Sequence, residues 1–472
     1  RLKAVFGDRV GVFHSKFSDN ERVEVWYGLM EGRFDFIVGV RSAIFLPFDQ
    51  LGLIIVDEEH ENSYKQFDPA PRYNARDAAL YLAYLHRAKT VLGSATPSLE
   101  SYTHAKQEKY GLVTLNERFG KTQLPEVHTA NLAKEKKQKS ATGDFTSVLM
   151  EHILASLDNK EQVIIFQNRR GYSSYVTCDD CGFIPNCHRC AVSLTYHQYK
   201  NQLNCHYCGH KEVVPVTCPA CGSTNIKTVG IGTEKIEEEL KLLYPEARIQ
   251  RMDLETTRSK YAYQQIIHEF ERGNIDILVG TQMVSKGLDF DHVSLVGVFD
   301  IDRMIHFPDF RSMERTFQLT TQVSGRAGRR QKRGKVVVQT RDPEQHILRW
   351  IENHDYETFY QAEMEERKNY HYPPFTKMIH LSIKSKDKNL TYDAAQFIAN
   401  LLREDLGPTR VLGPQEPLIN KIRDRFLMDV FLKVERKYSM EAVKERIMAA
   451  KLQILQEKRF SRVEIIPDVD PY

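Results

Sequence analysis

The stretch LGLIIVDEEH, residues 51–60, joins an apolar run of strand length to three carboxylates and a histidine. An apolar run that stops abruptly at polar residues is typical of a strand buried inside a parallel sheet. Similar short apolar runs at residues 10–14, 36–40 and 90–92 alternate with helical stretches. The alternation predicts a parallel sheet covered by helices, with the carboxylates at the edge where such sheets bind ligands.

The start of the chain continues this pattern. A helix is predicted to begin at Ser18, because Glu21 follows three residues later and completes a capping box. Residues 2–6 are expected to form a strand. Since this strand follows directly on Arg1, we interpret the chain as part of a longer polypeptide.

The composition sets broad limits on the class of protein. The 472 residues are 41% hydrophobic and 27% charged, which is ordinary for a soluble globular protein. It excludes a mainly disordered, collagen-like or membrane protein, and no window approaches the roughly 18 consecutive apolar residues of a membrane helix. No basic-then-apolar signal segment opens the chain, so we expect a cytoplasmic protein. The net charge of +3 does not by itself indicate nucleic acid.

The rhythm of the sequence predicts its domain organisation. Periodicity fails and polar and basic residues gather after the first α/β unit, which indicates a linker to a second α/β unit. The tail has the β-α-β-β-α-β order of a ferredoxin-like domain. The predicted parts are residues 1–118 (first unit), 119–143 (linker), 144–345 (second unit, with an insertion at 175–227), 346–375 (connecting helix) and 376–472 (C-terminal α+β domain).

All eight cysteines lie within the predicted insertion, as four C-x-x-C pairs. Two thiolates at this spacing bind one Zn²⁺ side by side, so four pairs predict two tetrahedral sites. The nested spacing predicts that the outer pairs share one zinc ion and the inner pairs share the other. The outer ligands are Cys178, Cys181, Cys218 and Cys221, and the inner ligands are Cys187, Cys190, Cys205 and Cys208.

The two zinc sites are predicted to be structural, because four thiolates leave no open position for water. Redox-active disulfides are disfavoured, since the chain shows metal spacing and no secretory signal. Four histidines of the same block could substitute as ligands, although eight cysteines need no substitute. These are His188, His197, His206 and His210.

The carboxylates after residue 56 suit nucleotide hydrolysis. One carboxylate holds Mg²⁺ there, and a second orients or deprotonates the attacking water. Asp57 suits the first task and Glu58 the second. The segment GSAT, residues 93–96, follows the next strand with small hydroxyl groups that can couple a nucleotide site to its neighbours. The alternative for both segments is a solvated strand end or turn.

Three segments of the second unit could also contribute to a nucleotide site. They are GTQM at residues 280–283, SKGLD at 285–289 and QVSGRAGR at 322–329. Arg326 and Arg329 lie three residues apart on glycine-rich backbone. Both guanidinium groups can therefore contact one phosphate, each with planar, bidentate geometry. The alternative is a basic surface loop, because residues 326–335 contain six basic residues and no acidic one.

Residues 64–77 interleave aromatic and basic side chains. Rings that stack on bases, set among cations that hold phosphates, suit single-stranded DNA. The alternative is an ordinary loop anchored by its tyrosines. The rings are those of Tyr64, Phe67 and Tyr73, and the cations are those of Lys65, Arg72 and Arg76.

Taken in order, these motifs resemble those of the superfamily 2 helicases, in which ATP lies between two RecA-like lobes. The eight-cysteine insertion, with YKQ at residues 64–66 and RYNARD at 72–77, narrows the resemblance to the PriA family of primosomal replication-restart helicases. It covers essentially the whole chain, including YPPF at residues 372–375 and DVDP at 468–471. It implies an α/β fold with two RecA-like P-loop NTPase lobes, the first one truncated. A two-zinc insertion in the second lobe and a C-terminal ferredoxin-like domain complete the implied architecture.

The resemblance also implies an activity and its residues. The activity is that of an ATP-dependent 3′–5′ DNA helicase, using Mg²⁺, in replication restart and primosome assembly at stalled forks. The implied partners are branched and single-stranded DNA, primosome proteins and single-stranded-DNA-binding proteins, with the helicase a monomer. The implied residues are Asp57, Glu58, Arg326 and Arg329 for catalysis, Gly287, Asp289 and Gln322 for the nucleotide, and Tyr64, Lys65, Arg72, Tyr73, Arg76 and Thr281 for DNA.

One departure from the family pattern affects the expected activity. The phosphate-binding loop G-x-x-x-x-G-K-[ST] should precede residue 57, and nothing there matches it. The segment GKT at residues 120–122 is not such a loop, because Leu115 stands where its first glycine would be. We therefore expect this chain by itself to lack DNA-stimulated ATPase. Two other readings remain: a non-catalytic, zinc-bearing DNA-binding scaffold, and an RNA helicase, which the cysteine insertion disfavours.

Overall fold

A computed structural model describes residues 2–14, 17–115, 117, 123–168, 175–197, 201–229, 233–253, 256–257, 259, 261–284, 290–328 and 333–471. The folded chain divides into two compact units, whose bounds differ from those of the predicted α/β units. From here on, the first unit is Arg1–Tyr102 with Pro471–Tyr472, and the second unit is Thr103–Asp470. In the described part, no helix has both the length and the apolar character needed to cross a membrane.

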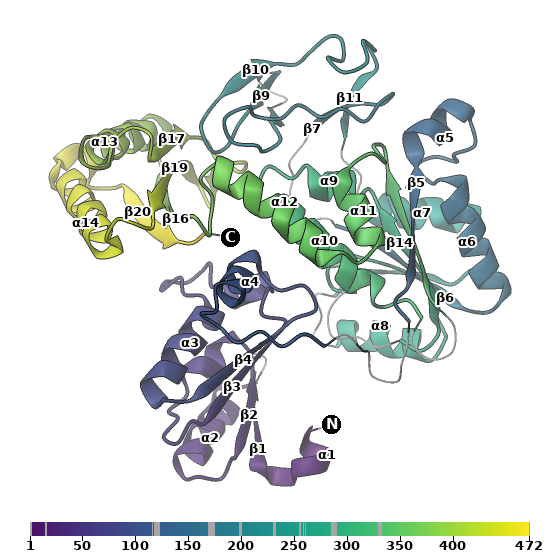
Figure 1. Cartoon of the computed structure of the whole chain (residues 1–472), viewed down its shortest axis with the longest axis horizontal. Helices are drawn as coiled ribbons and strands as arrows, with labels where there is room; N and C mark the ends of the chain where they lie inside the picture. Colours follow the sequence, from purple (N-terminus) through teal and green to yellow (C-terminus); the bar gives the residue numbers. More distant parts are fainter. Residues whose placement is uncertain are drawn as a thin grey trace. The chain divides into compact units, whose positions relative to one another are not determined.

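The first unit contains two pairs of parallel strands (Figure 1). β1 (Val10–Phe13) pairs with β2 (Phe36–Gly39), and β3 (Leu53–Asp57) pairs with β4 (Lys89–Gly93). These strands lie where the apolar runs predict them. Besides a short N-terminal helix, this unit contains α2 (Asp19–Met30), α3 (Ala75–His86) and the start of α4 (Leu99–Lys106), with α2 packed on β1 and α3 on β3 and β4.

Two expectations for the N-terminal end have different outcomes. The capping box is confirmed, because the Ser18 side chain accepts from the Glu21 N–H and the Glu21 carboxylate accepts from the Ser18 N–H. The expected strand at residues 2–6 is wrong, because this segment is helix α1 (Leu2–Phe6). None of its residues is buried, so no core contact favours an extended chain, and leucine, lysine and alanine favour a helix.

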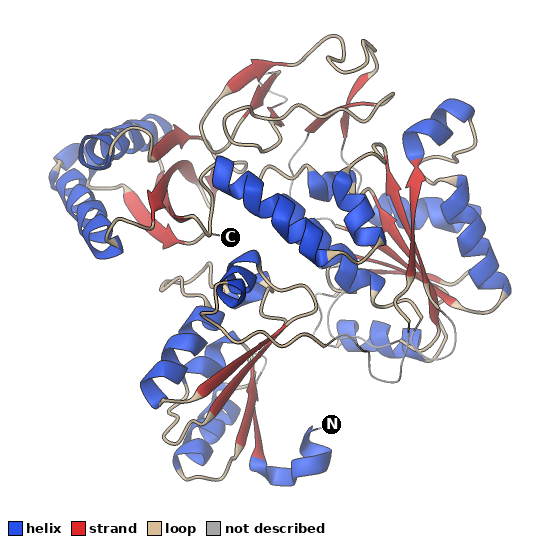
Figure 2. Ribbon diagram, viewed as in Figure 1, coloured by secondary structure: helices blue, strands red, loops and turns tan. Residues whose placement is uncertain are grey.

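The second unit contains a six-stranded sheet in which every neighbouring pair is parallel (Figure 2). α6 (Ser147–Asp158) and α7 (Thr233–Leu243) cover one face, and α10 (Ser312–Ser324) packs on the central strand β14. α8 (Ala262–Glu271), α9 (Asp302–Ile305) and α11 (His346–Glu352) complete this lobe. The strand order is β12 (Ile249–Met252), β13 (Ile277–Gly280), β6 (Gln162–Gln167), β14 (Val293–Phe299), β15 (Lys335–Thr340) and β5 (Glu126–Asn131).

Part of the predicted linker at residues 119–143 belongs to this sheet. β5 pairs with β15 along six residues, and α5 (Leu132–Gln138) follows it directly. The sequence of β5 is largely polar, because β5 is an edge strand that pairs with a neighbour on one side only. Its register with β15 depends on a partner some two hundred residues away, which local periodicity does not reveal.

The cysteine insertion has its own small sheets. β7 (Tyr175–Cys178) and β11 (Ile226–Val229) pair at its base. β8 (Thr195–His197), β9 (Gln202–Asn204) and β10 (Lys211–Val213) form an antiparallel sheet beyond them. The insertion therefore leaves the lobe and returns to it through one antiparallel pair.

The C-terminal domain follows α12 (Tyr356–Asn369) and has the predicted ferredoxin-like order. Its antiparallel sheet runs β17-β19-β16-β20, with the short strand β18 paired to β19, so the first strand in sequence, β16, lies between β19 and β20. Two helices cover the face that holds its apolar core. Its elements are β16 (Thr376–Ser385), α13 (Lys388–Leu406), β17 (Val411–Gln415), β18 (Lys421–Ile422), β19 (Arg425–Glu435), α14 (Met440–Gln456) and β20 (Glu464–Val469).

Candidate functional site

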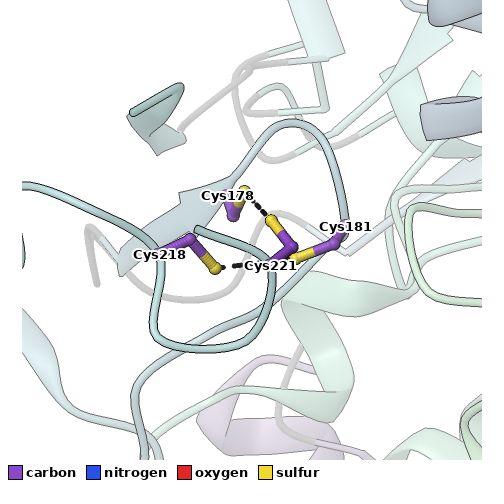
Figure 3. Close-up of side chains that lie close together, drawn as sticks. All are labelled: Cys178, Cys181, Cys218 and Cys221. Atoms are coloured by element: carbon purple, nitrogen blue, oxygen red, sulfur yellow. Dashed lines mark hydrogen bonds between the residues drawn. The ribbon is translucent and has the colours of Figure 1, made fainter. Parts of the chain in front are cut away.

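The outer cysteine pairs converge at the base of the insertion (Figure 3). Cys178 ends β7, and its Sγ lies 3.7 Å from that of Cys221, while the Sγ atoms of Cys181 and Cys218 are 3.6 Å apart. All four sulfurs lie within 4.8 Å of one another. This donor set fits one tetrahedral Zn²⁺.

The inner pairs form a second cluster of the same kind. The Sγ atoms of Cys187 and Cys208 are 3.7 Å apart, and the four sulfurs of Cys187, Cys190, Cys205 and Cys208 lie within 4.8 Å of one another. The predicted nesting is confirmed, because outer pairs meet outer pairs and inner pairs meet inner pairs. The two clusters support two zinc ions per chain.

Contact between the thiol groups shifts their pKa values in different directions. Hydrogen bonding with Cys187 raises the pKa of Cys190 and Cys205 and lowers that of Cys208. In the outer cluster, burial raises the pKa of Cys181 to about 12. Four thiols in contact cannot all ionise without a cation, and a divalent metal between them removes that obstacle.

All four C-x-x-C pairs use the same tight turn. The N–H of the residue after the second cysteine donates to the carbonyl of the first cysteine in every pair. That residue has positive φ, between 47° and 78°, which favours glycine. It is Gly182, Gly209 and Gly222 in three pairs and Ala191 in the fourth. These residues were not among the predicted site residues, although the C-x-x-C-G pattern, which recurs in three pairs, signals them.

The inner cluster packs against both the second lobe and the C-terminal domain. The Tyr372 hydroxyl donates to the Cys190 carbonyl at 2.9 Å, and the Tyr372 ring stacks on Phe310 at 4.4 Å. The Tyr207 ring lies 5.0 Å from Phe431 on β19. Burial lowers the pKa of Lys433, whose Nζ lies 3.5 Å from the centre of the Tyr372 ring, to about 8. The inner zinc site is thus part of the domain interface.

In the first unit, the D-E-E-H and G-S-A-T motifs meet at the ends of β3 and β4. His60 Nδ1 lies 2.7 Å from Ser94 Oγ and 3.5 Å from a Glu58 carboxylate oxygen. The Glu58 N–H donates to Asp57 Oδ1 at 3.0 Å, and Glu58 has positive φ. Asp57 is exposed and Glu58 is partly exposed, so both carboxylates are open to solvent.

Glu59, the third carboxylate of D-E-E-H, is instead buried in a polar network. It accepts from Arg76 at 3.1 Å, from the Ser98 N–H and from the Ser101 hydroxyl at 2.8 Å. Both partners of the ion pair are buried, at 2% and 7% exposure. The burial favours a positioning role for Arg76 over contact with DNA.

The loop after D-E-E-H is tied to the end of β3. The Tyr64 hydroxyl donates to the Asp57 carbonyl at 2.6 Å, and burial, with the nearby Asp57 charge, raises the pKa of Tyr64 to about 12. Lys65 is buried and donates to the Arg72 carbonyl. The Tyr73 ring contacts Phe45, whereas the exposed residues at the loop tip are 67–71.

The predicted residues of the second lobe are described only in part. Thr281 follows β13, Gln322 lies on α10 and Arg326 lies two residues beyond that helix, where it is buried. Gly287, Asp289 and Arg329 lie outside the described residues.

Acidic residues also follow the end of β14, at Asp300 and Asp302. They were not among the predicted site residues. Asp302 accepts from Thr340 and from the Arg341 N–H at 2.7 Å. The Arg341 guanidinium lies 3.7 Å from Asp300 and 3.6 Å from Asp179 of the first cysteine turn. Burial raises the pKa of Asp300, and it raises that of Asp302 to about 7. Two acidic residues directly after a buried strand were the available signal.

Comparison with known families agrees with this organisation. Residues 187–212 match the PriA DNA helicase Cys-rich region domain, 223–331 the helicase conserved C-terminal domain, and 368–472 the primosomal protein N C-terminal domain. Among solved structures, RecG bound to a three-way DNA junction matches 78% of this chain and 37% of that chain with a TM-score of 0.42 and 14% identity. That similarity is too low to support an argument.

Individual proteins match this chain along its whole length and with higher sequence identity than the solved structure does. Replication restart protein PriA of Bacillus subtilis is 42% identical over 473 residues, which cover 100% of this chain and 58% of the relative. The chain thus spans little more than half the length of that protein. Replication restart protein PriA of Rickettsia typhi is 34% identical over 471 residues, which cover 99% of this chain and 71% of the relative. The chain therefore belongs to the PriA family of replication restart proteins.

Proposed function

We propose that the chain is the motor and zinc-bearing part of an ATP-dependent 3′–5′ DNA helicase that acts in replication restart and primosome assembly at stalled forks. The name of its relatives and the matched helicase domain support this proposal. The observation that carries it is the 2.7 Å contact between His60 and Ser94, because it joins two motifs at the ligand-binding edge of parallel strands.

The proposed chemistry divides between the two lobes. Asp57 holds the Mg²⁺ that accompanies ATP, and Glu58 accepts a proton from the attacking water. Gln322, Arg326 and Arg329 contact the γ-phosphate, where the guanidinium groups neutralise charge that develops in the transition state. Gly287 and Asp289 line the nucleotide site. The exposure of Asp57 and Glu58 is consistent with access to a soluble nucleotide.

DNA contact is proposed to act through the loop at residues 64–77. Phe67 is 48% exposed and Arg72 is partly exposed, which supports the proposal that these side chains, with Tyr73 and Thr281, contact single-stranded DNA. Tyr64 connects this loop to the backbone carbonyl of Asp57, and this bond is the proposed route by which DNA contact affects residue 57. Lys65 and Arg76 hold the loop in place from inside the unit.

The partners in this proposal are branched and single-stranded DNA, primosome proteins and single-stranded-DNA-binding proteins, with the helicase a cytoplasmic monomer. The 472 residues contain no G-x-x-x-x-G-K-[ST] segment to hold the phosphates. We therefore propose that this chain alone does not hydrolyse ATP in response to DNA, whereas a longer protein that includes such a loop does.

The test is ATPase activity on forked DNA and on RNA, measured with the longer protein and with this chain. Glu58→Gln should abolish hydrolysis while ATP still binds, because the amide keeps the shape but cannot take a proton. Glu24→Gln, an exposed carboxylate on α2, is the matched control and should leave turnover unchanged. Near-normal turnover in Glu58→Gln removes that residue from its role, and stimulation by RNA alone contradicts the DNA helicase.

A second test addresses DNA binding by this chain directly. Affinity for single-stranded DNA should fall steeply with salt, because phosphate contacts release counterions. Arg72→Gln should weaken binding and reduce the salt dependence, whereas Arg87→Gln, an exposed arginine after α3, should do neither. An affinity that stays flat between low and moderate salt contradicts the proposed DNA contact.

A further inference from the structure

Three side chains that the zinc clusters do not use converge on the rim of the inner cluster. His188, His210 and Glu212 each bring a potential ligand atom within 4.8 Å of those of the other two. His188 lies inside the first inner cysteine turn. Glu212 lies on β10 and His210 directly precedes that strand. Residues two apart along an extended chain share a face, so His210 and Glu212 face the same side.

The contacts in this cluster suit a metal ion. His210 Nε2 lies 2.7 Å from Glu212 Oε1, and the rings of His188 and His210 meet edge to face with centroids 4.6 Å apart. Arg189 Nε donates to His188 Nε2 at 3.3 Å, so the lone pair of this nitrogen is directed at the Arg189 side chain. A metal ion can take the place of this N–H donor at the ring nitrogen. Arg189 is exposed and can turn away into solvent when a metal binds.

The inner zinc site holds these ligands in position. His188 lies between Cys187 and Cys190, and the His210 carbonyl accepts from the Cys205 N–H at 2.8 Å. Loading the inner site with zinc fixes both cysteine turns and therefore fixes the two histidines relative to each other. A metal site beside the inner zinc site would therefore start from two histidine ligands that are already held in position.

We propose that His188, His210 and Glu212 form a third metal site, which takes a divalent transition metal such as Zn²⁺, Co²⁺ or Ni²⁺. Imidazole and carboxylate ligands suit these ions. The three ligands come from a partly exposed surface, so water completes the coordination and the metal exchanges with solution. The site is therefore weaker and more labile than the two four-cysteine sites, in which five of the eight cysteines are buried.

A second pair of histidines in the same insertion provides a matched control. His197 Nε2 and His206 Nε2 lie 3.2 Å apart, and the second ring nitrogen of His206 lies 2.8 Å from the Glu416 carbonyl. Among the described residues, no carboxylate or third histidine joins this pair in a cluster of ligand atoms. Two histidines without a third protein ligand should bind the same metals less tightly.

The experiment uses the 472-residue chain carrying its two structural zinc ions. Co²⁺ or Ni²⁺ is titrated by calorimetry, and metal analysis after each titration checks that two zinc ions remain bound. One additional ion per chain should bind. His210→Ala and Glu212→Gln should each weaken this binding at least about tenfold, whereas His197→Ala should leave it unchanged.

Glu212→Gln is the decisive variant, because residue 212 is four positions from the nearest cysteine and its change leaves the turns intact. If the wild-type chain binds no additional ion, or if Glu212→Gln and His210→Ala bind it as tightly as wild type, the third site does not exist. Loss of the additional ion in His197→Ala would place it at the other histidine pair and overturn the assignment.

Discussion

The strands of the first unit and those of the large sheet in the second unit have similar apolar sequences but different surroundings. Ile55 on β3 is 67% exposed and its cross-strand neighbour Val91 is 49% exposed, whereas Ile165 on β6 is fully buried. α3 packs on β3 and β4, while Leu53, Ile55 and Val91 form a row that remains open. An apolar strand contributes to stability only to the extent that other elements cover it.

The first unit also depends on buried polar contacts. The pair Glu59–Arg76 and the Ser98 and Ser101 hydroxyls form a buried network that joins the end of β3 to α3 and α4. Such a network specifies one arrangement well but fails strongly when one partner is removed. The two units should therefore differ both in overall stability and in the type of mutation to which each is sensitive.

The largest expected difference is in hydrogen exchange. Amides of β3 and β4 should open with a free energy about 5 kcal/mol below that of β6 and β14, because local stability follows buried apolar contact. Hydrogen exchange read by mass spectrometry on this chain would measure it. Equal protection of the two sets of strands would contradict the comparison.

Removing the buried arginine should be nearly as costly. Arg76→Ala should destabilise the first unit by about 3–5 kcal/mol, because it leaves the Glu59 charge buried without its cation. Arg9→Ala, which removes an exposed pair with Asp35, should cost under about 1 kcal/mol. In a Trp350→Phe background, Trp26 is the only tryptophan, so its fluorescence during denaturation follows this unit. Similar effects of the two arginine variants would show that the network does not stabilise the unit.

A matched pair of isoleucines tests burial directly. Ile165→Ala should destabilise the second unit by about 2–5 kcal/mol, because it removes fully buried methyl groups and leaves a cavity. Ile55→Ala, at an exposed position of the same strand type, should change the stability of the first unit by less than about 1 kcal/mol. Trp350 fluorescence in a Trp26→Phe background reads the first variant, and Trp26 fluorescence reads the second. If Ile55→Ala is as costly as Ile165→Ala, the row at β3 and β4 is covered in solution.

The smallest expected effect concerns pH and belongs to the second unit alone. Burial raises the pKa of Asp302 to about 7, so the folded chain binds this proton more tightly than the unfolded chain. The stability that this carboxyl contributes is present at acidic pH and is lost as the pH rises through about 7. Asp302→Asn keeps an oxygen for the Arg341 N–H and should flatten the pH dependence of unfolding between about pH 5 and 7. An unchanged pH dependence would show that Asp302 is ionised in the folded chain.

Local sequence determined much of this protein. The strand ends that carry Asp57 and Glu58, the nesting of the cysteine pairs and the order of the C-terminal domain all follow from short-range patterns. Such patterns are informative because the period of an apolar run and the spacing of C-x-x-C act within a few residues. The glycine that follows the second cysteine in three of the four pairs was equally local and could have been recognised.

Only the tertiary structure decided which of these residues are available to ligands. The sequence predicts that Arg76 and Lys65 bind DNA, yet both side chains are buried. Inside the fold, Arg76 pairs with Glu59 and Lys65 donates to the Arg72 carbonyl. The pairing of β5 with β15 and the contact of Tyr372 with Cys190 join segments some two hundred residues apart. Burial and long-range pairing depend on which elements meet in space, and no local pattern contains that information.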